Sequence, residues 1–294
     1  MNKRDIAPFA GIASAVVVAA FVALAGSYNG AAVGGLRIFA LCAIVAFAIQ
    51  WLAFIPAYLF RTEKFFDLTG SLTYITIVGL AIVAAGGWEP RSLILAALVL
   101  AWAVRLGSFL FARVLQSGGD SRFDAMKRHD ASFLLTWTLQ GLWVFLTTSA
   151  ALAAITSKEP ATMDWTAFAG IAVWGVGFAI EVTADAQKQR FRSDPANRAR
   201  FISSGLWAWS RHPNYFGEIV LWIGVAVIAA PSLAGWQWVT MISPVFVAIL
   251  LTRISGIPLL ERRGEQRWGN DPGYQEYLAS TPALVPRPPA RARR

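Results

Sequence analysis

Residues 36–60 read LRIFALCAIVAFAIQWLAFIPAYLF, and after Arg37 this stretch contains no charged residue. An α-helix needs a run of about 20 apolar residues to cross the hydrocarbon core of a bilayer. The chain as a whole has the same character, because 56% of its 294 residues are hydrophobic and only 15% are charged. This composition leaves too little polar surface for a soluble globular protein. The stretch therefore predicts a membrane-spanning helix in an integral membrane protein.

Seven further apolar runs have a similar composition, although the third and the seventh of the resulting eight are short. Eight spans predict an all-α, polytopic bundle of transmembrane helices, and seven spans with a re-entrant segment are the alternative. The predicted spans are residues 6–26, 36–60, 71–85, 92–115, 133–155, 165–184, 216–230 and 236–254.

The basic residues predict the orientation of these spans. When eight spans are assigned, one side of the membrane receives only Arg37, Arg91 and Lys158, and nearly all of the other lysines and arginines lie on the opposite side. Lysine and arginine accumulate in cytoplasmic loops. We therefore expect both termini in the cytoplasm and a single multi-pass domain, residues 1–294, in a bacterial inner (cell) membrane.

Charge and metal-ligating residues exclude several functions. A net charge of +9 is expected for loops beside anionic lipid, so membrane lipids rather than nucleic acid are the predicted partners. Cys42 is the single cysteine, and His129 and His212 are the only histidines, so we predict no disulfide and no metal site. Gly175-Val176-Gly177 lies inside an apolar span and is predicted to pack helices rather than to bind a dinucleotide.

Ionisable residues in or beside the spans are candidates for function, because burying them is costly. Arg105 lies inside the fourth span, where a snorkelling arginine is the alternative. Glu181 and Asp185 are followed by Lys188 and Arg192 at a spacing that places all four on one helix face.

Two further groups flank predicted spans. Asn214 and Glu218 follow Pro213, which suits the first turn of a helix. Asp67, four residues after Glu63, is expected to be the N-cap of the third span. We predict one charged cavity open to the cytoplasm, formed by Asp67, Arg105, Glu181, Asp185, Asn214, Glu218 and Arg253.

Residues 181–286 resemble the steroid 5-alpha-reductase family, in particular its bacterial membrane members. The similar motifs are Glu181-x3-Asp185-x6-Arg192, Ser204-Gly205-Leu206-Trp207, Pro213-Asn214-Tyr215-Phe216-Gly217-Glu218 and Tyr277-x6-Leu284-Val285-Pro286. The resemblance is clear over this last third of the chain and weak from Arg105 onward. It implies a helical membrane bundle that binds NADPH in a polar cytoplasmic cavity, above a pocket for an apolar substrate from the lipid phase.

The resemblance also implies roles for individual residues. Cofactor contacts are implied for Asp185, Arg192 and Asn214, with Glu181 replacing an amide that is usual in the family. Further cofactor contacts are expected from Arg105, Arg122 and Arg253, since arginine suits the phosphates of NADPH, and from Glu218, which ends the motif that begins at Pro213. Trp102 stands where steroid reductases carry a tyrosine beside the substrate ketone, and Asp67 falls near an acidic substrate-binding position, so both are candidate catalytic residues.

The implied reaction reduces the conjugated carbon-carbon double bond of a 3-oxo-4-ene steroid or a similar apolar enone. Hydride reaches the beta carbon, a proton reaches the alpha carbon, and the carbonyl oxygen needs a hydrogen-bond donor. A carboxylic acid kept neutral by apolar surroundings could be that donor, and Asp67 or Glu63 is the predicted group.

A membrane methyltransferase of the isoprenylcysteine type, dependent on S-adenosylmethionine, is the alternative. Its Arg-His-Pro-x-Tyr-x-Gly pattern fits residues 211–217. However, residues 260–265 lack the adjacent pair of glutamates expected of that class, and Asn214 with Glu218 favours the reductases.

Overall fold

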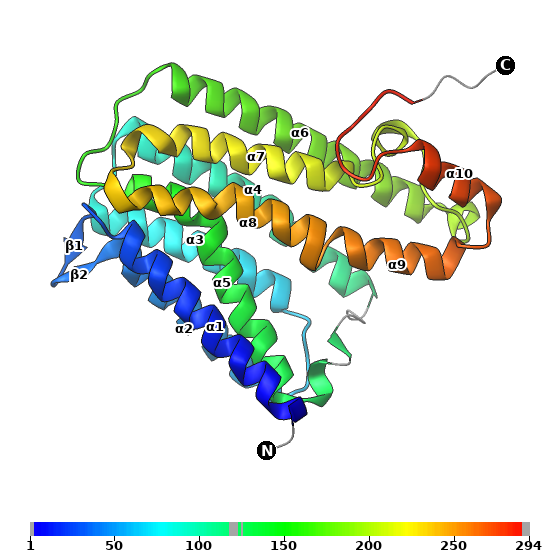
Figure 1. Cartoon of the computed structure of the whole chain (residues 1–294), viewed down its shortest axis with the longest axis horizontal. Helices are drawn as coiled ribbons and strands as arrows, with labels where there is room; N and C mark the ends of the chain where they lie inside the picture. Colours follow the sequence, from blue (N-terminus) through cyan, green and yellow to red (C-terminus); the bar gives the residue numbers. More distant parts are fainter. Residues whose placement is uncertain (1–2, 118–122, 125, 290–294) are drawn as a thin grey trace. The chain divides into compact units, whose positions relative to one another are not determined.

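The computed structural model describes residues 3–117, 123–124 and 126–289, and this part of the chain is mostly helical (Figure 1). The long elements are α1 (Lys3–Gly26), α2 (Ile38–Leu59), α3 (Phe66–Ala85), α4 (Pro90–Ser117), α5 (Asp130–Ile155), α6 (Trp165–Ser193), α7 (Pro213–Ala229), α8 (Ile242–Ile249), α9 (Ile257–Trp268) and α10 (Pro272–Ser280). The short helical segments are η2 (Met126–Arg128), η3 (Pro195–Asn197), η4 (Gly205–Ala208), η5 (Ala230–Ser232), η6 (Gly235–Met241) and the π-helical η7 (Leu250–Ile254). The strands β1 (Ala32–Val33) and β2 (Leu36–Arg37) pair antiparallel.

Eight helical stretches in the described part of the chain are long and apolar enough to cross a membrane. This finding confirms the predicted all-α polytopic bundle, and the protein is an integral, multi-pass membrane protein. The last stretch, Gly235–Trp268, is not one regular helix, because it comprises η6, α8, η7 and α9.

The third span begins earlier than predicted, and this changes the position of Asp67. The backbone N–H of Phe66 donates to Glu63 O at 2.8 Å, and that of Thr69 donates to Phe65 O at 2.8 Å. Phe65 is therefore the N-cap of α3, and Asp67 lies in the first helical turn. The N-cap prediction for Asp67 was wrong, because the apolar run was counted only after the charged residue, whereas the backbone is already helical there. A carboxylate in the first turn still interacts favourably with the helix dipole.

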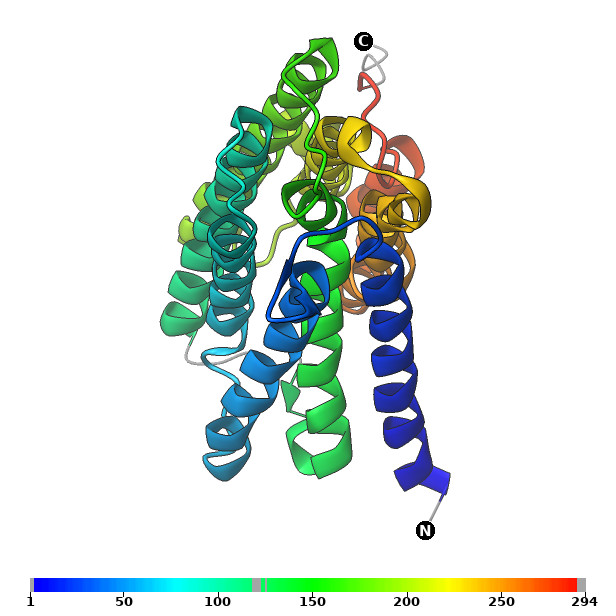
Figure 2. The ribbon, with the colours of Figure 1, turned by 90° about the vertical axis from the view of Figure 1, so that its left-hand side faces the viewer.

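The chain forms two compact units, unit 1 (Met1–Ala167 with Val225–Ser243) and unit 2 (Phe168–Gly224 with Pro244–Arg294). In unit 1, α5 contacts α1, α2, α3 and α4, and Figure 2 shows α5 between α1 and α2. The buried second half of α5 includes the small residues Thr147, Thr148, Ser149, Ala150 and Ala151, which allow neighbouring helices to approach closely.

Arg91, at the start of α4, is 1% exposed and fully engaged in structural contacts within unit 1. Its guanidinium donates to Thr162 O at 2.6 Å, to Asp164 Oδ1 at 2.8 Å and to Ile228 O at 2.7 Å. A hydrogen bond from Thr166 and then the one from Arg91 lower the pKa of Asp164 to about 2, so this carboxylate stays charged. Arg91 thus ties the start of α4 to the start of α6 and the end of α7.

Within unit 2, α6 and α7 lie side by side (Figure 1) and approach through glycines. A Cβ atom at Gly177 would lie 2.5 Å from Leu221 N, and one at Gly217 would lie 2.7 Å from Glu181 N. No larger residue fits either position, so the predicted packing role is confirmed for Gly177. Gly175 has no atom within 4 Å of its added Cβ and does not share that role.

Candidate functional site

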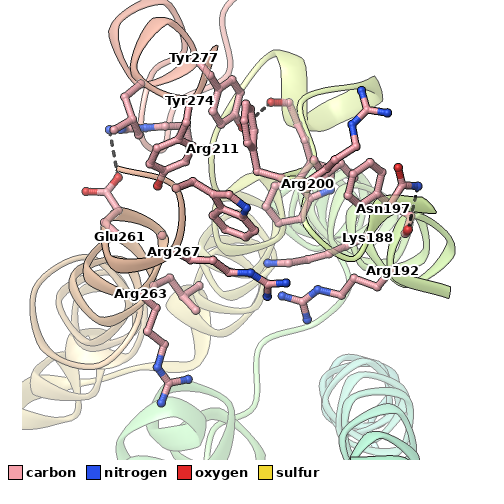
Figure 3. A pocket seen from close by; sticks show the side chains of 18 of the residues that line it. Lys188, Arg192, Asn197, Arg200, Arg211, Glu261, Arg263, Arg267, Tyr274 and Tyr277 are labelled. Atoms are coloured by element: carbon pink, nitrogen blue, oxygen red, sulfur yellow. Dashed lines mark hydrogen bonds and ion pairs between the residues drawn. The ribbon is translucent and has the colours of Figure 1, made fainter. Parts of the chain in front are cut away.

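Unit 2 contains a cavity of about 490 Å³ between the end of α6, the loop that follows it, α9 and α10 (Figure 3). Its lining is dominated by basic and aromatic side chains. The lining residues are Lys188, Phe191, Arg192, Asn197, Arg198, Arg200, Phe201, Ile202, Trp207, Arg211, His212, Leu260, Glu261, Arg263, Gly264, Arg267, Trp268, Tyr274, Tyr277 and Leu278.

The cavity is strongly basic. Six arginines and one lysine line it, whereas Glu261 is the one carboxylate among the described lining residues. Figure 3 shows the nitrogen ends of Lys188, Arg192 and Arg267 directed toward one another. Like charges brought together repel, and an anion placed between them removes that repulsion. The cavity is therefore suited to a ligand that carries several negative charges.

Aromatic rings cover one side of the same cavity. The ring of Phe201 lies 5.1 Å from that of Tyr274 and 5.4 Å from that of Tyr277. The Tyr277 hydroxyl donates to Trp207 O at 2.7 Å, and Lys188 Nζ lies 4.4 Å from the centre of the Trp207 ring. Burial raises the pKa of Tyr274 and of Tyr277, so both phenols are neutral. These rings offer flat faces to a planar ligand group.

The one carboxylate is already engaged. Glu261 Oε1 lies 3.0 Å from Arg211 Nη2 and 3.6 Å from His212 Nε2. The imidazole of His212 is 5% exposed and stacks on Tyr215 with a centroid distance of 5.7 Å. Burial lowers the pKa of His212, although Glu261 opposes this effect, and the imidazole is predicted to be neutral near pH 7.

Four of the residues predicted to contact the cofactor lie on α6 and α7, but they do not line this cavity. Asn214 Nδ2 donates to Asp185 Oδ1 at 3.1 Å, which joins α7 to α6. Asn214 Oδ1 is buried without a hydrogen-bond partner in the described part of the chain, so it can accept a hydrogen bond from a ligand. Glu181 and Glu218 are 2% and 7% exposed.

The other predicted cofactor residues have different positions. Arg192 lines the basic cavity, whereas Arg253 is exposed in η7 and does not line it. Arg105 belongs to α4 in unit 1, where it is half-buried with its guanidinium 5.3 Å from the centre of the Phe109 ring. Arg122 lies outside the described residues. The predicted common cavity combines residues of both units, and it stays a prediction.

Sequence reasoning missed most of the basic cavity. The missed basic residues are Arg198, Arg200, Arg211, Arg263 and Arg267. The available signal was the high density of basic residues in two loops, which the positive-inside bias also explains.

Unit 1 contains a smaller cavity of about 50 Å³ between α3, α4 and α5, which we call the α3–α5 cavity. It brings together Asp67 and Trp102, which were predicted as catalytic residues from different spans. The lining residues are Asp67, Gly70, Ser71, Tyr74, Trp102, Ala103, Leu106, Gly107, Leu110, Gln140, Trp143 and Val144. The ring of Tyr74, which sequence reasoning missed, lies edge-on to that of Trp102 at 5.2 Å.

The two predicted acidic groups differ in their surroundings. Asp67 lines the α3–α5 cavity, and its Oδ2 lies 3.7 Å from Arg113 Nη2. Glu63 does not line that cavity, and its Oε2 lies 2.5 Å from Lys127 Nζ. The buried Glu63 carboxylate is held by an ammonium group, whereas Asp67 faces the cavity. Geometry therefore favours Asp67 over Glu63 as the group that meets a ligand.

Comparison with known proteins gives three findings. A sequence profile described as "Protein of unknown function (DUF1295)" matches residues 53–281. The 3-oxo-5-alpha-steroid 4-dehydrogenase 1 of Rattus norvegicus is 27% identical over 118 residues, which is 40% of this chain and 40% of that protein. The chain thus matches about two fifths of the length of that relative. No solved structure matches this chain.

Proposed function

The chain belongs to the DUF1295 family, which is steroid 5-alpha-reductase-like and thus related to oxidoreductases, and we propose that it is an NADPH-dependent enone reductase of a bacterial inner membrane. The substrate is an apolar molecule from the lipid phase with a carbon-carbon double bond conjugated to a ketone, such as a 3-oxo-4-ene steroid. The observation that carries this proposal is the basic, aromatic cavity of unit 2.

The lining of that cavity fits NADPH. The cofactor carries a pyrophosphate and a 2′-phosphate, and the two-nitrogen fork of arginine binds phosphate oxygens in pairs. Lys188, Arg192 and Arg267 would hold phosphate groups, and the aromatic side chains would pack against a planar ring of the cofactor. When bound, NADPH supplies the hydride.

The residues of the α3–α5 cavity would act on the substrate. A hydride added to the beta carbon moves the electrons of the double bond toward the carbonyl, and negative charge develops on its oxygen. Tyr74, and Asp67 in its protonated form, are the proposed hydrogen-bond donors to that oxygen. Asp67 is also the proposed donor of the proton that adds to the alpha carbon, and it takes up a proton from water afterwards, so that enone, NADPH and one proton give the saturated ketone and NADP⁺.

Cavity charge also bears on the methyltransferase alternative. The motif over residues 211–217 supports that alternative, since Arg211 and His212 both line the cavity. S-adenosylmethionine, however, carries a positively charged sulfonium group and no phosphate. Seven cationic side chains would repel it, which favours the reductase.

Binding of three cofactors to the purified, full-length protein in detergent tests this proposal. Isothermal titration calorimetry should detect NADPH binding that weakens as salt is added, weaker binding of NADH and no binding of S-adenosylmethionine. Binding of S-adenosylmethionine without binding of NADPH would establish the methyltransferase class instead.

A matched pair of variants tests the site. Arg192 lines the cavity, whereas Arg190, exposed on the same helix, does not. Loss of a charge-assisted hydrogen bond costs about 1.5–3 kcal/mol, so Arg192→Ala should weaken NADPH binding by about 10-fold to 100-fold. Arg190→Ala should leave NADPH affinity unchanged. Equal affinities in the two variants would remove Arg192 from the cofactor site.

A further inference from the structure

The α3–α5 cavity contains two polar groups from one helix that have no hydrogen-bond partner. Gln140 and Trp143 are three residues apart on α5, which places them on one face, and both line the cavity. Gln140 Oε1 and Trp143 Nε1 are both buried, and neither is hydrogen-bonded within the described part of the chain. A buried polar atom without a partner costs about 1–3 kcal/mol, so such atoms are normally paired.

The orientation of the Gln140 amide is fixed. Its Nε2 donates to Phe66 O at 3.1 Å, so Oε1 is the atom left for another partner. A Cβ atom at residue 70 would lie 2.6 Å from Nε2, and only Gly70 leaves room for the amide. The group that Gln140 has left to offer a ligand is therefore an acceptor. The indole of Trp143 has a donor and no acceptor.

A second tryptophan on α5 shows that an unpaired indole alone does not indicate a ligand site. Trp137 Nε1 also has no hydrogen-bond partner among the described residues, but Trp137 does not line the cavity. Its ring packs against Phe66 at 5.1 Å and Phe65 at 5.8 Å. Trp143 differs because it lines the same cavity as Gln140, which also has an unpaired polar atom.

The volume of the cavity limits what these two groups can bind. About 50 Å³ accommodates a few groups of the size of a water molecule, and therefore one polar end of a ligand rather than a whole steroid. An acceptor and a donor on one helix face match a ligand end that carries a donor next to an acceptor.

We propose that Gln140 and Trp143 recognise the polar end of the substrate, and that this end carries a hydroxyl group on the carbon next to the ketone. The Trp143 N–H donates to the ketone oxygen, and Gln140 Oε1 accepts a hydrogen bond from the hydroxyl. The ketone oxygen has two lone pairs, so it can accept from Trp143 and from Asp67 or Tyr74 together. This inference rests on the proposed function, and it narrows the substrate class from enones to hydroxylated enones.

Binding of two probes without NADPH tests the inference separately from catalysis. The probes are a 3-oxo-4-ene steroid and its 2-hydroxy derivative, whose hydroxyl is on the carbon next to the ketone. The net contribution of one hydrogen bond predicts that the wild-type protein binds the hydroxylated probe about threefold to tenfold more tightly. Gln140→Met should abolish this preference. Trp143→Phe should lower the affinity for both probes by the same factor and therefore leave the preference unchanged.

Infrared difference spectra of probes labelled with ¹³C at the ketone report the Trp143 contact directly. A hydrogen bond lowers the stretching frequency of the ketone, so Trp143→Phe should raise it relative to wild type. Trp137→Phe is the matched control and should leave the frequency and both affinities unchanged. The ratio of the two probe affinities is measured on the wild-type protein alone, so this test still decides the inference if a variant does not fold.

The possible failures are distinguishable. Equal affinity of the wild-type protein for both probes, with no effect of either variant, overturns this inference and leaves the proposed function standing. No binding of either probe by a protein that binds NADPH overturns the proposed substrate class itself.

Discussion

Asp67→Asn is the substitution that most directly tests the proposed chemistry. Asparagine has nearly the same size as aspartate and its amide can donate a hydrogen bond, but it cannot release a proton. If Asp67 supplies the proton, turnover of Asp67→Asn should fall on the order of 100-fold, which corresponds to about 2.7 kcal/mol, because general acid catalysis contributes at least about that factor. Asp67→Ala should fall at least as far, because it removes the donor altogether.

The structure predicts that the cost in stability is much smaller than the cost in rate. Asp67 Oδ2 lies 3.7 Å from Arg113 Nη2, and the Arg113 side chain is 45% exposed. Ion pairs with a solvent-accessible partner contribute about 0–1 kcal/mol, and a carboxylate in the first helical turn contributes about 0.3–1 kcal/mol. The melting temperature should therefore change little while turnover collapses.

The assay measures NADPH oxidation and product formation with a 3-oxo-4-ene steroid, together with NADPH affinity and melting temperature for each variant. Arg113→Gln is the control, because it breaks the same ion pair but leaves Asp67 in place, and it should keep turnover within a few-fold of wild type. Full turnover in Asp67→Asn, with NADPH still bound, would refute the role of Asp67 as an acid. Tyr74→Phe would then be the next variant to measure.

Two further predictions concern orientation and pH. A cysteine introduced at the exposed Lys158, rather than at its neighbour Ser157, which is 8% exposed, should react with an impermeant label only from the extracytoplasmic side. A cysteine at the exposed Ser193 should react only from the cytoplasm. Labelling of both from one side would contradict the eight-span topology. Because the pKa of His212 is lower in the folded protein than its ordinary value of 6.5, the unfolded chain binds more protons below that pH. The melting temperature should therefore fall as the pH drops below about 6.5, and His212→Gln should weaken this dependence; an unchanged dependence would exclude His212 as its source.

Apolar runs predicted the helical spans well because lipid imposes one dominant requirement on a helix. They placed the start of the third span too late, because only uncharged, apolar residues were counted toward a span. A helix can begin in a turn that contains a charged residue, as α3 does at Phe66. The charge of Asp67 lowers the hydropathy of that turn, so the turn was not recognised as part of the span. The eighth helical stretch is longer than the predicted span, because the charged helix α9 follows η7.

The site was only partly predictable from sequence. Asp67 and Trp102 were both selected through the resemblance to the steroid reductases, although they belong to different helices, and the structure places both at the α3–α5 cavity. Tyr74 and Gln140 lie in apolar spans, where a tyrosine or glutamine ordinarily packs or bonds to a neighbour. Their position at a cavity depends on how α3, α4 and α5 pack, and the spacing of residues along one helix does not contain that information.

The positive-inside bias explains why unit 2 has many basic residues, but it does not explain why several of them converge on one cavity. The positive-inside bias requires only that lysines and arginines lie on the correct side of the membrane, and in the predicted topology Arg190 and Arg262 would meet that requirement without lining the cavity. Lys188, Arg192 and Arg267 are additionally directed toward one another (Figure 3), which raises their mutual repulsion. The orientation of the helices in the membrane does not require this convergence, since the same charges spread over the loops would orient the helices equally well. An anionic ligand would be bound more tightly by converging charges, and this difference is the physical basis for the proposal that the cavity binds a phosphate-bearing cofactor.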